Sequence, residues 1–159
     1  MKYKNELILS WEEVHKEALE LAEIISLSEI KYDGIIAITK GGLFPALIVS
    51  TFLRIDYIDT ICIRSYKKKK QKETKLIKSP IGKMNISKWL IIDDLTDTGE
   101  TIEMTKSFFG TYSTVDVGVL YTKPKGHHTV DYSIKKFFQD TWIVFPWEKN
   151  IHLNKGGLQ

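Results

Sequence analysis

The sequence is poor in the residues that would support a disulfide framework or a thiolate metal cluster. Cys62 is the single cysteine among 159 residues, and it lies in the apolar run 60–63, where a small buried side chain is expected. No stretch reaches the roughly 18 to 20 consecutive apolar residues of a membrane span, and the first residues lead into no signal-peptide core. These absences exclude cysteine redox chemistry as the function. They predict a cytoplasmic protein that contacts no membrane.

The composition is that of one globular domain. Hydrophobic residues make up 43% of the chain and charged residues 27%, which is sufficient for a sizeable buried core. The sequence contains no internal repeat and no linker that would separate domains. We therefore expect a single domain over residues 1–159.

The net charge of +3 is unevenly distributed. Nine lysines lie between residues 66 and 88, opposed only by Glu73, so the remainder of the chain is acidic. A segment with this excess of positive charge is typical of a binding site for an anion. We predict an extended, mobile loop that could act as a lid over an anionic ligand, with a merely solvated loop as the alternative.

Strand and helix signals alternate along the chain. Ser10 and Glu13 form a capping box for an amphipathic helix over 11–26. An apolar strand at 34–39 is followed by Lys-Gly-Gly and a helix over 43–53. Further strands are predicted at 59–65, 89–92 and 115–121. This order predicts an α/β fold with a twisted, mainly parallel sheet flanked by helices, whose ligands gather at the carboxyl ends of the strands.

Three polar loops are expected to meet at that edge, at residues 39–42, 93–101 and 122–126. The second carries the most chemistry, because two adjacent carboxylates, Asp93 and Asp94, are predicted to end a buried strand. Thr98 to Thr101 then open a helix, whose free N–H groups and dipole would hold a phosphate monoester. The two carboxylates could accept hydrogen bonds from a ribose diol or hold Mg²⁺. Solvated turn residues and a helix cap are the alternative reading.

These residues resemble a known family. Residues 90–101, Leu-Ile-Ile-Asp-Asp-Leu-Thr-Asp-Thr-Gly-Glu-Thr, resemble the binding motif for 5-phosphoribosyl 1-pyrophosphate (PRPP) in type I phosphoribosyltransferases. Residues 38–43 resemble the pyrophosphate loop, and Ser65-Tyr66 opens a segment similar to the flexible catalytic loop. Residues 122–124, 139–143 and 146–147 resemble the purine-recognition elements of the xanthine-guanine (6-oxopurine) members.

The resemblance implies a purine-salvage enzyme that depends on Mg²⁺. It would transfer the 5-phosphoribosyl group of PRPP to N9 of guanine, xanthine or hypoxanthine, forming the nucleoside 5′-monophosphate and pyrophosphate. It also implies the type I phosphoribosyltransferase fold, with a core over about 10–125 and a small hood from about 1–9 and 126–150. The family usually dimerises, so a homodimer is expected, with a tetramer as the alternative.

The resemblance assigns a role to each site residue. Asp93 and Asp94 would serve catalysis and bind Mg²⁺. The groups that would bind the PRPP phosphate are Asp97, Thr98, Gly99, Glu100 and Thr101. Those that would bind pyrophosphate are Lys40, Gly41 and Lys72, and the peptide bond before Lys40 would be cis. A plain strand-to-helix turn is the alternative for this loop.

Base recognition is assigned to later residues. Asp97 would face N7 of the purine as the general acid/base, and Lys123 would donate to the 6-oxo group. Trp142 would stack on the base, although an aromatic residue in an apolar stretch is often only core. The carbonyl of Ile143 could accept from a 2-amino group.

A second class of function remains open. Some proteins of this fold are regulators that bind nucleic acid and sense PRPP, and the lysine-rich segment could supply phosphate contacts. No helix-turn-helix fits in a chain of this length, so no nucleic acid partner is expected. Within the enzyme class, an enzyme that rejects xanthine is the main rival.

Overall fold

The computed structural model describes residues 4–68, 71–80, 87–109 and 114–149, and the side chains of these residues except 64–68 and 71–74. Twelve elements follow one another along this part of the chain. They are β1 (Asn5–Ile8), α1 (Trp11–Leu27), β2 (Gly34–Thr39), α2 (Leu43–Leu53), β3 (Ile58–Lys68), β4 (Gln71–Lys78), β5 (Lys88–Thr96), α3 (Glu100–Ser107), β6 (Thr114–Thr122), the 3₁₀ turn η1 (His127–Thr129), β7 (Tyr132–Lys136) and β8 (Thr141–Val144).

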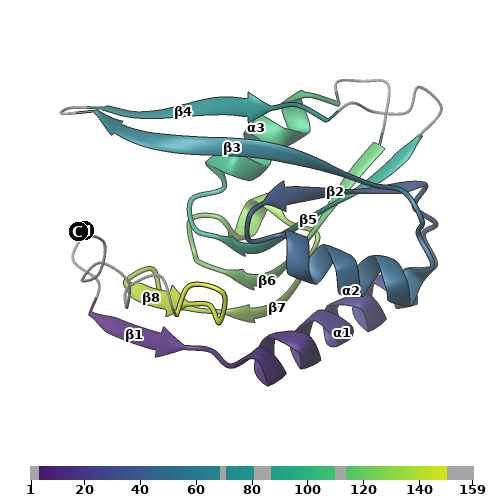
Figure 1. The fold of residues 1–159 in the computed structure, drawn as a ribbon, viewed down its shortest axis with the longest axis horizontal. Helices are drawn as coiled ribbons and strands as arrows, with labels where there is room; N and C mark the ends of the chain where they lie inside the picture. The colour runs from purple at the N-terminus through teal and green to yellow at the C-terminus, as the bar shows by residue number, and fades with distance from the viewer. Residues whose placement is uncertain (1–3, 69–70, 81–86, 110–113, 150–159) are drawn as a thin grey trace, which may run out of the picture.

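The strands form a six-stranded sheet in the order β4-β3-β2-β5-β6-β7 (Figure 1). Strands β3, β2, β5, β6 and β7 pair in parallel, and β4 pairs with β3 antiparallel. The predicted α/β fold with a mainly parallel sheet is confirmed. Among the described residues, no helix has the length and apolar character needed to cross a membrane.

Alternating side chains of the central strands fill two separate cores. On one face, α1 and α2 pack against the sheet, with Ile35 and Ala37 of β2 and Leu90 of β5 among the buried residues. On the other face, Ile102 of α3 packs with Ile36 and its neighbours. Because side chains of a strand point alternately to its two faces, an almost wholly apolar strand is required where helices cover both.

The first helix begins as its sequence predicts. Ser10 caps α1, accepting from the Glu13 backbone N–H at 3.1 Å, while the Glu13 carboxylate accepts from the Ser10 backbone N–H at 2.7 Å. Strand β2 and helix α2 also have their predicted bounds.

Strand β5 is longer than predicted, and the interpretation that it ends at Asp93 and Asp94 was wrong. The strand runs to Thr96, because its pairing with β6 continues through Leu95 opposite Tyr121 and Thr96 opposite Thr122. Asp93 and Asp94 therefore lie inside the paired strand, close to its C-terminal end, rather than in the loop after it. The polar side chains of this segment indicated a loop, whereas its backbone is still paired with strand β6.

The described part of the lysine-rich segment differs from the prediction of a loop, and residues 69–70 and 81–86 lie outside the described residues. Strands β3 and β4 pair antiparallel, with Lys67 opposite Lys72 (Figure 1). Main-chain hydrogen bonding between the two strands is compatible with lysine side chains on a sheet edge, a position where charged residues are common.

The chain ends that were expected to form a hood are divided between two sheets. Strands β1 and β8 pair in parallel as a separate two-stranded sheet, with Glu6 opposite Trp142. Strand β7 instead extends the main sheet beside β6. In Figure 1 the small sheet lies beside the N-terminal end of α1, on the side of the molecule where β6 and β7 lie.

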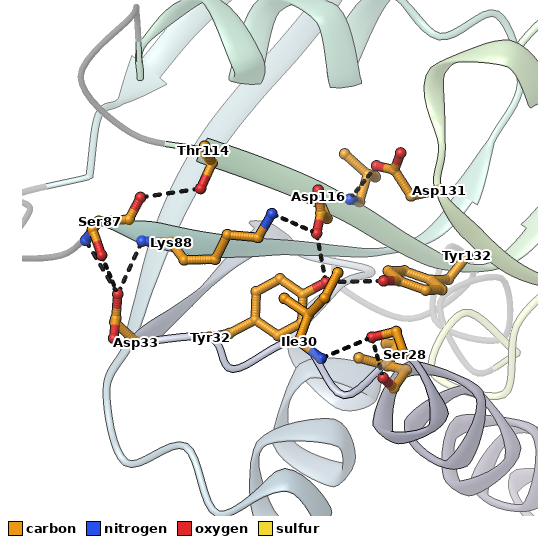
Figure 2. Close-up of polar contacts among 12 residues, drawn as sticks. Ser28, Ile30, Tyr32, Asp33, Ser87, Lys88, Thr114, Asp116, Asp131 and Tyr132 are labelled. Atoms are coloured by element: carbon orange, nitrogen blue, oxygen red, sulfur yellow. Dashed lines mark hydrogen bonds and ion pairs between the residues drawn. The ribbon is translucent and has the colours of Figure 1, made fainter.

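A network of hydrogen bonds and an ion pair connects residues near the N-terminal ends of the parallel strands (Figure 2). The Tyr32 hydroxyl donates to the Asp116 carboxylate at 2.7 Å and lies 3.1 Å from the Tyr132 hydroxyl, while the Lys88 ammonium lies 2.9 Å from the same carboxylate. Nearby, the Lys88 backbone N–H donates to Asp33, which helps to lower the pKa of that carboxyl. This network lies at the opposite edge from the loops that follow β2, β5 and β6.

Candidate active site

Three loops with polar side chains follow neighbouring strands of the main sheet. Strands β2, β5 and β6 are adjacent and parallel, so the segments after Thr39, Thr96 and Thr122 lie at one edge. A backbone bond joins two of them directly, because the Lys123 N–H donates to the Thr96 carbonyl at 3.0 Å. The predicted convergence at the carboxyl ends of the strands is confirmed.

The first and second segments meet at Gly41 and Asp94. A Cβ on Gly41 would overlap the carboxylate of Asp94, so only glycine lets the turn before α2 approach β5 so closely. The peptide bond between Thr39 and Lys40 in the same turn is cis, as the resemblance implied. The structure thus brings the loop 40–42 against the carboxylates of β5.

Asp93 and Asp94 form an electrostatically strained pair. Asp93 is 7% exposed, and burial together with the charge of Asp94 raises its pKa well above the ordinary range. Burial raises the pKa of Asp94 to about 6, with a contribution from the charge of Glu148. Burial is thus the main cause for both residues, and a side-chain hydrogen bond with Asp93 acts in the opposite direction on the pKa of Asp94. Two buried carboxylates favour a cation or hydrogen-bond donors from a ligand.

The donor set fits Mg²⁺ when other oxygens complete it. Among the described residues, no group of three or more His, Cys, Asp or Glu side chains is arranged to hold a metal ion. A metal site at Asp93 and Asp94 would supply two carboxylates, and the remaining oxygen ligands would come from substrate and water. Mg²⁺ accepts such a mixed set because it commonly keeps several waters and binds one or two carboxylates.

The segment between β5 and α3 packs against η1. Gly99 has a positive φ of 87° and forms the N-cap of α3, and a Cβ at this position would lie 2.5 Å from the Thr129 methyl group. Thr129 is held in turn, since its carbonyl accepts from the Lys106 ammonium at 3.0 Å. The glycine therefore allows both the turn and the close packing beneath it.

The other predicted phosphate-binding residues of this loop lie at the start of α3. Thr98 and Thr101 are partly buried at the start of α3, whereas Glu100 is exposed. The first N–H groups of a helix and its dipole favour a phosphate at this point.

Asp97 and Lys123 lie together although 26 positions separate them in sequence. The Lys123 ammonium is 3.5 Å from the Asp97 carboxylate. The lysine side chain is only 2% exposed, while that of Asp97 is 41% exposed. A buried ammonium needs a partner, and Asp97 supplies one while remaining accessible to a ligand.

Gln139 also contacts Asp97. Its side chain donates from Nε2 to Oδ1 of Asp97, and its Oε1 accepts from the Lys125 backbone N–H at 3.1 Å. We did not predict this contact, although Gln139 stands in the segment 139–143 singled out by sequence. The pairing depends on how the β7–β8 connection folds over the loop after β5.

Trp142 and Ile143 occupy opposite sides of strand β8. The Trp142 ring is 44% exposed and lines a groove of about 460 Å³ together with Lys4, Asn5 and Glu6. Ile143 is 4% exposed and belongs to the core beneath α1 and α2. The Trp142 ring is therefore partly accessible from solvent, whereas the Ile143 side chain is buried and could offer a ligand only its backbone.

Two of the predicted pyrophosphate groups are less defined. The Lys40 side chain is exposed beside the cis peptide bond. The backbone of Lys72 lies in β4, but its side chain falls outside the part of the chain whose side chains the structure describes.

Comparison with known proteins assigns the chain to a family. A model of the phosphoribosyl transferase domain matches residues 5–151. The chain belongs to the phosphoribosyltransferase family. It is 40% identical over 148 residues to the xanthine-guanine phosphoribosyltransferase of Desulfotalea psychrophila, a match that covers 92% of this chain and 89% of that protein.

Solved structures of phosphoribosyltransferases have the same fold. The purine phosphoribosyltransferase from Pyrococcus horikoshii superimposes with a TM-score of 0.78 at 29% identity, covering 91% of this chain and 94% of that one. The Helicobacter pylori xanthine-guanine-hypoxanthine phosphoribosyltransferase gives a TM-score of 0.82 at 20% identity, covering 96% of this chain and all of that one. The latter similarity concerns the fold alone.

Proposed function

We propose that this phosphoribosyltransferase serves purine salvage, transferring the 5-phosphoribosyl group of PRPP to N9 of a 6-oxopurine. Guanine, xanthine and hypoxanthine are the acceptors, and the products are the nucleoside 5′-monophosphate and pyrophosphate. The relative from D. psychrophila is named for xanthine and guanine, and the neighbour from P. horikoshii for purines. These names favour the transferase over a nucleic-acid-binding regulator of the same fold.

The observation that carries the proposal is the adjacency of Asp97 and Lys123, whose carboxylate and ammonium lie 3.5 Å apart. In a 6-oxopurine, N7 and the 6-oxo oxygen are neighbours on one edge of the base. An acid/base group for N7 and a cationic donor for the 6-oxo oxygen must therefore also be neighbours. An adenine amino group would instead direct its own N–H groups toward the ammonium of Lys123 and be rejected.

The charges of the site suit the electron flow of the reaction. The C1–O bond to pyrophosphate breaks as the bond from N9 to C1 forms, so positive charge develops on the ribose and negative charge on the leaving group. The carboxylates of Asp93 and Asp94 would face the ribose hydroxyls and offset the developing positive charge. Asp97 takes up the proton that the base loses at N7.

The leaving group is assigned to the loop of Lys40 and Gly41, with Lys72 of the β3–β4 hairpin as a further contact. The Gly42 N–H donates to the Ile38 carbonyl at 2.8 Å, so the backbone N–H groups of Lys40 and Gly41, with the exposed Lys40 ammonium, would offset the charge of pyrophosphate. Mg²⁺, held by Asp93 and Asp94, would neutralise charge on the pyrophosphate oxygens when it is bound.

The base is assigned to the side of Trp142. Its exposed ring in β8 offers a stacking surface for a purine, a contact that is common for aromatic side chains. The carbonyl of the adjacent buried Ile143 would accept from a 2-amino group, which favours guanine. These two contacts complete the base pocket.

A homodimer is the proposed assembly, with a tetramer as the alternative. Helix α2 is apolar on nearly all sides, and Leu43, Leu47 and Phe52 are 46%, 57% and 42% exposed. An exposed apolar surface of this kind is typical of an interface between subunits. Nearby, Phe44 and Tyr57 are partly buried against Trp11 and Trp89, so they offer less apolar surface to a second subunit.

A spectrophotometric assay tests the function. The protein is supplied with PRPP and Mg²⁺ and offered guanine, hypoxanthine, xanthine and adenine in turn, in parallel with the Asp97→Asn variant. We expect turnover of oxopurines that is lost without Mg²⁺ and severely reduced in the variant. If a folded protein that binds PRPP turned over none of the bases, the transferase proposal would be refuted.

A further inference from the structure

Gln139 connects the three segments that surround Asp97. The residue lies between β7 and β8, and its partly buried side chain reaches the loop that follows β5. Its amide contacts Oδ1 of Asp97 and lies 3.5 Å from the Asp97 carbonyl, and it also accepts from the Lys125 backbone N–H at 3.1 Å. One side chain thus spans the connections after β5, β6 and β7.

The surroundings fix the orientation of this amide. The backbone N–H of Lys125 can only donate, so it requires the carbonyl oxygen Oε1 of Gln139. The –NH₂ group must then face Asp97, where the carboxylate and the main-chain carbonyl can only accept. The reversed amide would place donor against donor on one side and acceptor against acceptor on the other.

The two oxygens of Asp97 consequently have different surroundings. Oδ1 accepts from Gln139, whereas Oδ2 lies on the side of the Lys123 ammonium, 3.5 Å away. Without the amide, a 41% exposed aspartate in a loop could rotate about its side-chain torsions. With the Gln139 amide in place, Oδ1 is held by a hydrogen bond and Oδ2 lies on the side of Lys123, to which the base is assigned.

We propose that Gln139 is a positioning residue for catalysis, which holds Asp97 so that Oδ2 faces N7 of the purine. The inference rests on the proposed function, because it takes Asp97 as the acid/base group. Holding a reacting group in place contributes to the rate, and a displacement of about 1 Å can lower it on the order of 100-fold. Gln139 itself transfers no proton and touches no reacting atom.

The test compares Gln139→Ala and Gln139→Glu with Phe138→Ala, measured as kcat and as KM for PRPP and for guanine. Phe138 is the neighbour of Gln139 in the same connection, and its side chain is 77% exposed, so the control measures general disturbance of the loop. We expect both Gln139 variants to lower kcat about 10- to 100-fold with little change in KM for PRPP, and Phe138→Ala to retain wild-type kcat.

The pH profile separates positioning from a merely structural role. The carboxyl introduced by Gln139→Glu is isosteric with the amide, but when ionised it has no N–H to donate and repels Asp97. When protonated it can donate again, so kcat of this variant relative to wild type should rise as the pH is lowered. The Gln139→Ala variant lacks any group to protonate and should show no such recovery.

A double-mutant cycle provides a second readout. If Gln139 acts through Asp97, the Gln139→Ala change should add almost nothing to the loss caused by Asp97→Asn. The positioning role is refuted if the Gln139 variants keep wild-type kcat, if only KM changes, or if the two losses multiply. An inactive wild-type enzyme would refute the proposed function instead, so the two failures are distinguishable.

Discussion

Gly41 packs against the carboxylate of Asp94 so closely that a Cβ at position 41 would overlap it. The turn that begins α2 and the end of β5 are therefore in direct contact, although more than 50 positions separate them in sequence. The contact brings the loop assigned to pyrophosphate and the carboxylates assigned to the ribose into one site.

Gly41→Ala should severely impair the enzyme. The added methyl group must displace either the backbone of the turn or the Asp94 carboxylate, and misplacement by about 1 Å costs on the order of 100-fold in rate. We expect kcat/KM for PRPP to fall by about that factor, measured at saturating guanine. Thr51→Ala on the exposed side of α2 serves as the control. An active Gly41→Ala enzyme would contradict the assignment of this turn.

Lys123→Met should impair recognition of the base and leave PRPP binding intact. The substitution keeps the apolar stem of a buried side chain and removes the ammonium that faces Asp97. We expect KM for guanine to rise at least about tenfold, the cost of a lost hydrogen bond to a charged donor, with KM for PRPP nearly constant. The matched control is Lys125→Met, at an exposed position in the same turn. Equal effects at both positions would count against the assignment.

Asp94→Asn should stabilise the substrate-free protein at neutral pH. Burial raises the pKa of Asp94 to about 6, so between about pH 4 and pH 6 the native state holds a proton that the unfolded state has released. The free energy of unfolding of the wild type therefore falls as the pH rises through this window. Asparagine cannot ionise, and the variant should have the higher Tm above pH 6 and no advantage below pH 4.

Added Mg²⁺ provides the counterpart of that measurement. If Asp93 and Asp94 hold the ion, Mg²⁺ with PRPP should raise the Tm of the wild type more than that of Asp94→Asn, because binding to the native state stabilises it by mass action. The difference should shrink as the pH falls below about 6, where Asp94 takes up a proton. An equal rise in both proteins would argue against this pair as the metal site.

Tyr32→Phe should reduce stability without reducing activity. The substitution removes the donor to Asp116 and the partner of the Tyr132 hydroxyl (Figure 2). We expect the free energy of unfolding to fall by about 1 to 2 kcal/mol in urea denaturation, with kcat unchanged because the network lies at the opposite edge of the sheet. Lys31→Ala, at the exposed neighbouring position, is the control. A loss of kcat in a stable Tyr32→Phe protein would contradict this separation.

The elements with local signals were predictable from sequence. The capping box of Ser10 and Glu13 fixes the start of α1, and the unbroken apolar run 34–39 fits a strand buried on both faces. The strand through Asp93 and Asp94 was not bounded correctly, because its pairing with β6 decides where it ends. The lysine-rich hairpin was missed for the same reason, since charge describes side chains and strand pairing is a property of the backbone.

The candidate site likewise contains residues that could be predicted from sequence and contacts that could not. The run of carboxylates, threonines and glycine after β5 is contiguous, so its chemistry could be inferred from spacing and from the resemblance. The roles that the resemblance gave to Asp97 and Lys123 already implied that the two lie close together. The contact of Asp97 with Gln139 could not be inferred, because it joins loops that only the tertiary structure brings together. The contact of Gly41 with Asp94 depends on the parallel pairing of β2 with β5.

The sequence by itself determined the fold class, the candidate phosphate loop and the residue types of the candidate site, because local periodicity and contiguous motifs encode them. Only the tertiary structure decided which carboxylate oxygen faces Lys123, which glycine touches Asp94, and that Gln139 holds Asp97. These relationships depend on side-chain directions at a scale of a few ångströms. They arise from the packing of strands and loops that are distant in sequence, which no local pattern specifies.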